Sequence, residues 1–172
     1  MRKKIFAFLL LSALYAGAQE VPDWENPIVV GINKEPYHAT LTLPSQKADC
    51  KEIISLNGKW RFQWSAGPGK RPADFYKNDF NTDTWDTITV PGAWQLQGYG
   101  KPIYSNVNYP FQKDAPKVTS EPPAEYYSYG HRNPTGSYVT TFEVTPDMKD
   151  KCLYLHFEGV KSAMYVWVNG ER

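Results

Sequence analysis

SLNGKWRFQW, residues 55–64, is the stretch of sequence that decides the fold. After an Asn-Gly turn signal, the aromatic residues Trp60, Phe62 and Trp64 alternate with polar residues. Successive side chains of a β-strand point to opposite faces, so all three rings enter one face of a sheet. Aromatic residues are also enriched in strands. We therefore predict a strand with one strongly apolar face.

Four further short runs predict strands on either side of this one. They are residues 87–90, 137–144, 152–157 and 163–168. Short apolar runs separated by 14 Pro and 12 Gly, without a long helical period, are typical of an all-β domain. Asn169-Gly170 then predicts a hairpin turn, after which only two residues remain. Five strands are few for a closed sandwich, and the last has no returning partner.

Length and charge limit the function. The 172 residues, of which 41% are hydrophobic, suffice for one domain with a packed core. Because 19 Lys and Arg residues face 18 Asp and Glu residues, the formal net charge is only +1. Such a chain has no strong field for phosphate backbones or anionic lipid, so we expect neither nucleic acid nor a membrane as partner.

The N-terminus predicts a secretory signal peptide over residues 1–18. A basic start at residues 2–4 precedes a short apolar run over residues 5–15, and Ala-Gly-Ala at residues 16–18 fits a cleavage site. The apolar run is too short to span a bilayer. No Cys follows the cleavage site to carry a lipid. We therefore expect a periplasmic or secreted protein.

The next segment, residues 19–54, holds four prolines and little periodicity. It predicts an extended N-terminal arm lying on something larger, or else a flexible leader. Secretion permits a disulfide between Cys50 and Cys152, but two separate thiols fit the spacing equally well. The three histidines lack the spacing of metal ligands, so no metal site is indicated.

Residues 92–136 form a long stretch with many prolines and tyrosines and no periodicity. A stretch of this length inside a compact domain is typical of a functional loop system. The structural alternative is a Pro-rich cover over a sheet edge.

Several motifs, in order, resemble one family. They are DWENP (23–27), INKEPYHATL (32–41), SLNGKWRFQW (55–64), VPGAWQLQGYGKPIYSNVNYPF (90–111), NPTGSY (133–138) and FEGVKSAMYVWVNGER (157–172). Together they resemble the N-terminal region of a secreted, bacterial-type β-galactosidase of glycoside hydrolase family 2. Several multi-residue matches in one order are more specific than any single motif.

The resemblance implies a jelly-roll, galactose-binding-like β-sandwich over residues 55–172, incomplete at its C-terminus because the sequence is truncated within the domain. It implies a retaining enzyme that hydrolyses terminal non-reducing β-D-galactosyl residues in carbohydrate metabolism. Its two catalytic carboxylates would lie in missing downstream domains of the same enzyme. The isolated chain is then inactive, and we name no catalytic residue in it. Complete enzymes of the family often use Mg²⁺ and Na⁺ ions, and the oligomer, including a homo-oligomer, is left open.

The resemblance places one sugar contact in this chain, at Asn106 of YSNVNYP. An amide both donates and accepts hydrogen bonds, as sugar hydroxyls do. The alternative is an Asx-turn residue that fixes the loop. Tyr104, Asn108 and Tyr109 are further loop contacts to sugar, of lower rank.

Other residues are expected to be structural. Most acidic residues are expected to be solvated loop charges, and most loop tyrosines to pack the loop against its own sheet. Tryptophans 60, 85, 94 and 167 are expected in the core because each lies in or beside a strand or corner.

Two alternatives stay open. One is a free-standing, secreted carbohydrate-binding module without catalysis. The other keeps the family but changes the substrate to a β-glucuronide or β-mannoside. The open last hairpin favours the enzyme fragment, because a self-sufficient module closes its sandwich.

Overall fold

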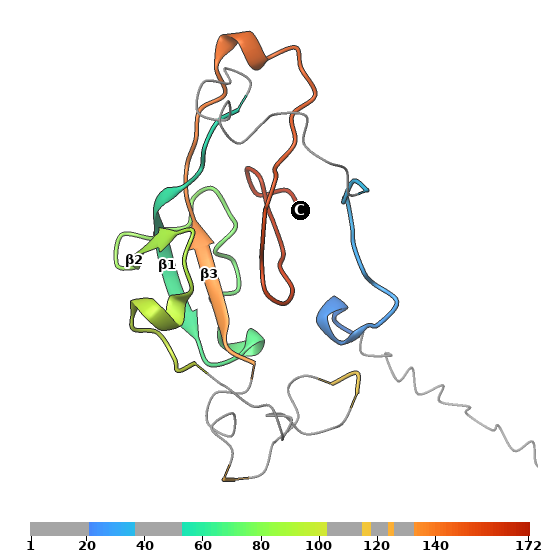
Figure 1. Cartoon of the computed structure of the whole chain (residues 1–172), viewed down its shortest axis with the longest axis vertical. Helices are drawn as coiled ribbons and strands as arrows, with labels where there is room; N and C mark the ends of the chain where they lie inside the picture. Colours follow the sequence, from blue (N-terminus) through green and yellow to red (C-terminus); the bar gives the residue numbers. More distant parts are fainter. Residues whose placement is uncertain (1–20, 37–52, 103–114, 118–123, 126–132) are drawn as a thin grey trace, which may run out of the picture.

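An antiparallel three-stranded β-sheet forms the centre of the computed structural model, which describes residues 21–36, 53–102, 115–117, 124–125 and 133–172. The central strand β1 (Gly58–Ser65) pairs on one side with β2 (Asp86–Val90) and on the other with β3 (Thr135–Val139), as Figure 1 shows. In these ranges the helical elements are short 3-10 turns: η1 (Asp23–Glu25), η3 (Pro68–Lys70), η4 (Trp94–Gln97) and η6 (Pro146–Met148). The prediction of an all-β fold is confirmed.

The register of the sheet gathers its aromatic residues on one face. Phe62 of β1 lies opposite Tyr138 of β3, and Trp64 lies opposite Gly136. On the other side of β1, Trp60 lies opposite Ile88 of β2. Since residues that are directly opposite share a face, the alternation in residues 60–64 produces one apolar surface, as the sequence predicts.

The core is built around Phe62, which is fully buried at 0% exposure. Its ring packs against Tyr138 and Tyr99, each with a centroid distance of 4.7 Å, and against Trp94 at 6.2 Å. Trp94 belongs to η4, which therefore covers the sheet. Gly136 permits this approach, because a Cβ there would lie 2.6 Å from the Trp94 ring.

A second aromatic cluster joins the chain after β1 to the C-terminal segment. Trp167 stacks on Tyr76, with centroids 5.1 Å apart and planes 12° apart, and meets Phe75 edge-on at 5.5 Å. Phe75 also contacts Trp85, which is 8% exposed. This cluster ties residues 163–172 to the loop that follows η3.

The Asn-Gly turn at the end of this segment forms as predicted. Val168 and Glu171 exchange two backbone hydrogen bonds, of 2.8 and 3.0 Å, between their N–H and C=O groups. Asn169 and Gly170 between them have φ values of 52° and 88°. Both values are positive, as a type I′ turn requires.

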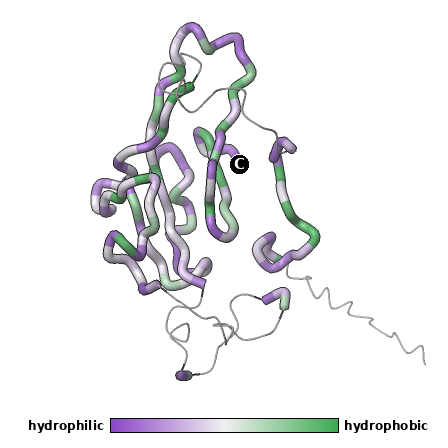
Figure 2. Tube along the Cα trace, viewed as in Figure 1, coloured by the Kyte–Doolittle hydropathy of each residue, from purple (hydrophilic) through white to green (hydrophobic). Residues whose placement is uncertain are grey.

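Three strand predictions need correction. Of the strand predicted over residues 137–144 only the first part forms, because β3 ends at Val139. Residues 152–157 and 163–168 run irregularly apart from the Val168–Glu171 bridge. Hydrophobic residues recur along this part of the chain (Figure 2), and several are exposed: Phe142, Leu153, Tyr154, Leu155, Phe157, Val160, Met164 and Val168. Apolar and polar residues thus alternate in these segments although no neighbouring strand among the described residues pairs with them.

The described part of the N-terminal arm, residues 21–36, runs as an extended segment interrupted by η1. It meets the C-terminal segment (Figure 1): the Asn33 side chain donates to the Arg172 carbonyl at 3.3 Å, and Asp23 forms an ion pair with the Arg172 guanidinium. Among the described residues, no helix is long and apolar enough to cross a membrane.

Candidate functional site

The four sugar contacts predicted from the sequence, Tyr104, Asn106, Asn108 and Tyr109, lie in residues 103–114, outside the described part of the chain. The tyrosines at 126, 127 and 129 lie outside it as well. Their roles stay predictions. The structure does describe the chain that leads into residues 103–114.

That leading segment is fixed to the sheet by a side-chain amide. The N–H of Thr89 donates to Gln97 Oε1 at 2.8 Å, and Gln97 Nε2 donates to the Thr89 carbonyl at 3.0 Å. Gly98 then takes a φ of 97° and closes η4. Tyr99 follows, packed on Phe62. Burial raises the pKa of the Tyr99 phenol, and a hydrogen bond with Asp86 adds to the shift.

The acidic residues singled out from the sequence lie at the surface. Asp83, Asp86 and Glu125 are exposed. Glu121 lies outside the described residues. Glycoside hydrolysis needs one carboxyl group that keeps its proton beside a second that is ionised. The exposure of Asp83 and Glu125 fits the prediction of solvated loop charges, whereas Asp86 is the first residue of β2 and hydrogen-bonds Tyr99.

The tryptophans divide between core and surface. Trp85 is buried, as predicted, whereas Trp60, Trp94 and Trp167 are half-buried. Trp60 packs edge-on against Tyr138, with centroids 6.4 Å apart. Trp167 has a second role that the sequence did not indicate, because one side of it lines a pocket.

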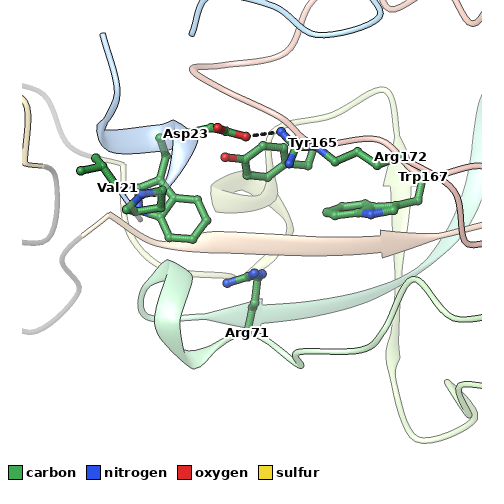
Figure 3. A pocket seen from close by; sticks show the side chains of 8 residues that line it. Val21, Asp23, Arg71, Tyr165, Trp167 and Arg172 are labelled. Carbon is green, nitrogen blue, oxygen red and sulfur yellow. Dashed lines mark hydrogen bonds and ion pairs between the residues drawn. The ribbon is translucent and has the colours of Figure 1, made fainter. Parts of the chain in front are cut away.

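This pocket, of about 270 Å³, lies between the N-terminal arm and the C-terminal segment (Figure 3). Its lining comes from three separate parts of the sequence: Val21, Pro22, Asp23, Trp24, Arg71, Tyr165, Trp167 and Arg172. Its lining combines aromatic rings with charged groups, a composition that suits a small polar ligand with an apolar face.

The charged groups of the pocket are placed by the aromatic rings. The Arg172 guanidinium lies over the Tyr165 ring, 4.4 Å from its centroid, and pairs with Asp23. The Arg71 guanidinium lies over the Trp24 ring at 5.3 Å. Burial raises the pKa of the Tyr165 phenol, and the nearby Asp23 carboxylate raises it further.

No signal in the sequence identifies this pocket in advance. Trp24 lies in the DWENP motif and Tyr165 in a predicted strand, but nothing in either pattern says that the two rings meet. In the structure they pack edge-on with centroids 6.0 Å apart.

The cysteines and metal ligands are described only in part. Cys152 is exposed with a free thiol, and Cys50 lies outside the described residues. Within the ranges that the structure covers, no three His, Cys, Asp or Glu side chains gather to hold a metal ion.

The antiparallel sheet with aromatic residues on one face defines an all-β domain. The chain belongs to glycosyl hydrolase family 2, because the sequence model of that family's sugar binding domain matches residues 53–172. The family resemblance found in the sequence motifs is thereby confirmed.

Several relatives of the chain are beta-galactosidases. The beta-galactosidase of Priestia megaterium (strain DSM 319 / IMG 1521) is 40% identical over 166 residues, which are 91% of this chain and 15% of that protein. The beta-galactosidase of Vibrio vulnificus (strain CMCP6) is 39% identical over 86% of this chain and 14% of its own length. That of Clostridium acetobutylicum is 40% identical over 87% of this chain and 17% of its own length. The chain thus spans about one seventh of these relatives.

Proposed function

We propose that this chain serves as the sugar-binding domain of a retaining β-galactosidase that removes terminal non-reducing β-D-galactosyl residues. The catalytic carboxylates are supplied by parts of the enzyme outside these 172 residues. One observation carries the proposal: the chain is about 40% identical to beta-galactosidases over nine tenths of its length while covering only 15% of theirs.

Asn106 is the residue through which this domain contacts the substrate. The YSNVNYP segment that holds it follows η4, which is anchored to the sheet by Gln97, Trp94 and Tyr99. A segment with a rigid base holds a polar side chain in position better than a free loop does. The Asn106 amide then hydrogen-bonds a galactose hydroxyl, to which it can donate or from which it can accept.

The test is a chimera in which residues 21–172 replace the matching segment of the Priestia megaterium beta-galactosidase. We expect the chimera to hydrolyse a chromogenic β-galactoside. Asn106→Ala should lower kcat/KM by roughly 5- to 150-fold, because leaving a buried polar group without a hydrogen-bond partner costs about 1–3 kcal/mol. Gln95→Ala, which removes an amide in η4 outside the YSNVNYP segment, is the control. A deoxygalactoside that lacks the contacted hydroxyl should be cleaved nearly equally by the Asn106 variant and its parent. A folded but inactive chimera, or equal losses on both substrates, would contradict the proposal.

The 172-residue chain by itself is expected to show no turnover of the same substrate. If the chain does show activity, and if substituting one of its acidic residues abolishes that activity, the proposal that the catalytic carboxylates lie outside this chain is wrong. The competing function, a free-standing carbohydrate-binding module, predicts that the isolated chain binds galactosides as tightly as the chimera does. We favour the enzyme domain because every relative compared is far longer than this chain.

The cellular location of the protein is proposed from its N-terminal sequence alone. A cleavable signal peptide over residues 1–18 directs the protein to the periplasm or the medium. N-terminal sequencing of the mature protein tests this, and a mature chain that still begins at Met1 would refute it.

A further inference from the structure

The pocket between the arm and the C-terminal segment has the size of a single ring. Its volume of about 270 Å³ lies just below the range of about 300–1,000 Å³ that holds drug-sized ligands. Trp24 from the arm lines it. Arg71 from the loop after η3, and Tyr165 and Trp167 from the C-terminal segment, line it as well (Figure 3). A ligand of one sugar unit therefore fits the available space.

The aromatic side of the pocket is held rigidly. Trp167 is stacked on Tyr76 with planes 12° apart, and this fixes its orientation. Tyr165 is held between Trp24, at 6.0 Å, and Trp167, at 5.8 Å. Fixed aromatic rings offer an apolar surface at low entropic cost, which suits the apolar CH face of a pyranose ring.

The charges of the pocket favour an anion. Of its three charged groups, the Arg172 guanidinium is neutralised by Asp23. The remaining one, Arg71, donates through Nη1 to the Pro68 carbonyl at 2.6 Å and lies over Trp24. No carboxylate pairs with Arg71 in the parts of the chain that the structure describes. A guanidinium has five donors and matches a carboxylate in a bidentate geometry, so Arg71 keeps donors available for an acidic ligand.

We propose that this pocket is an ancillary binding site for one acidic sugar unit, a pyranose that carries a carboxylate. The carboxylate pairs with Arg71, and the apolar face of the ring lies against Tyr165 and Trp167. The site differs in ligand chemistry from the contact proposed for Asn106, whose galactosyl ligand is neutral. It does not depend on the proposed function, so either proposal can fail alone.

The experiment follows the indole N–H signals of the six tryptophans in the ¹⁵N-labelled full chain during titration with D-galacturonate. We expect the signals of Trp24 and Trp167 to shift saturably, while those of Trp60 and Trp64 in β1 stay in place. The unmoved signals report within the same spectra that the sheet is intact. D-galactose has the same ring without the carboxylate, and D-gluconate has a carboxylate without the ring. Each should bind at least about tenfold more weakly, a difference of 1.4 kcal/mol.

Arg71→Gln removes the proposed partner of the carboxylate and should weaken galacturonate binding at least about tenfold. The matched control is Lys70→Gln, which removes an exposed cation next to Arg71 that does not line the pocket. Added salt should weaken binding to the parent chain, because the pairing is electrostatic.

Three results would overturn the proposal: no saturable shift of Trp24 and Trp167, equal affinity for galactose and galacturonate, or equal affinity of the two variants. Should Arg71→Gln disturb the unmoved signals, the comparison of the three ligands on the parent chain still decides the question.

Discussion

At the scale of single residues, Tyr138 links the core to solution pH. It packs on Phe62 and Trp60 in the apolar face of the sheet, and burial raises the pKa of its phenol. The unfolded phenol ionises near pH 10. Above about pH 10 the unfolded chain therefore loses a proton that the folded chain retains, and the free energy of unfolding falls as pH rises toward the folded pKa.

We expect Tyr138→Phe to lose less stability than the parent chain between about pH 8 and about pH 11, because it has no phenol to ionise. Urea unfolding followed by tryptophan fluorescence measures this. Tyr154→Phe, at a residue that is 71% exposed, is the control. An unchanged pH slope for Tyr138→Phe would show that the phenol does not contribute.

Gly136 is the second residue whose identity is dictated by its neighbours. A Cβ there would lie 2.6 Å from Trp94 and 2.8 Å from Phe62, well inside van der Waals contact. We expect Gly136→Ala to lower the free energy of unfolding by about 1–3 kcal/mol through overpacking. Gly69→Ala is the control, since its Cβ would meet nothing within 4 Å. Equal unfolding midpoints for the two variants would contradict the close packing of η4 on the sheet.

At the scale of elements, strand β2 is paired by a side chain where a further strand would lie. The Gln97 carboxamide bonds both the N–H and the carbonyl of Thr89, as a neighbouring backbone would. We expect Gln97→Ala to lower the free energy of unfolding by about 1 kcal/mol, since a net hydrogen bond contributes about 0.5–1.5 kcal/mol and these two are exposed.

Thermal unfolding of Gln97→Ala measures this effect. Gln95→Ala, which changes a residue of the same short turn, is the control. Gln97→Glu keeps the acceptor for the Thr89 N–H but loses the donor to its carbonyl, so it should be intermediate. A ranking in which Gln95→Ala is the least stable variant would refute the role of this amide.

The elements also show which predictions the sequence supports. The strands at residues 60–64 and 87–90 were predicted because aromatic or β-branched residues alternate between turn signals, and β1 and β2 confirm them. Residues 152–157 alternate just as clearly, yet no ladder forms there. Alternation reports that a segment has two faces, whereas a strand exists only when its N–H and C=O groups find a partner. The partner is a property of the whole chain and is invisible in a local pattern.

At the scale of the whole molecule, much apolar surface is exposed. Between residues 142 and 168, Leu153 is 52% exposed and Tyr154 is 71% exposed, within a longer series of exposed hydrophobic side chains. Exposed apolar surface promotes association. The isolated chain should therefore self-associate as its concentration rises.

Replacing both Leu153 and Tyr154 by Lys should shift the sedimentation profile toward the monomer. Thr141→Lys adds charge at an exposed polar position and serves as the control. If the double variant and the control sediment alike, the apolar surface does not drive association.

The pocket, too, could not be predicted from local sequence patterns. Its residues come from positions 21–24, 71 and 165–172, and each lies in a local pattern that indicates something else. Trp167 was expected in the core and is half-buried against Phe75 and Tyr76, but its place in the pocket beside the arm depends on long-range folding. The loop that carries Asn106 was singled out by its motif, and its geometry stays a prediction.

The contact between Asp23 and Arg172 also sets an order of events during synthesis. The two residues are 149 positions apart. At about 5–20 residues per second, Asp23 leaves the ribosome roughly 7–30 s before its partner. During that interval β1 and β2, close together in sequence, can pair, while Trp24 has no Tyr165 to pack against. The arm, made first, is therefore the last part of the described structure to take its place.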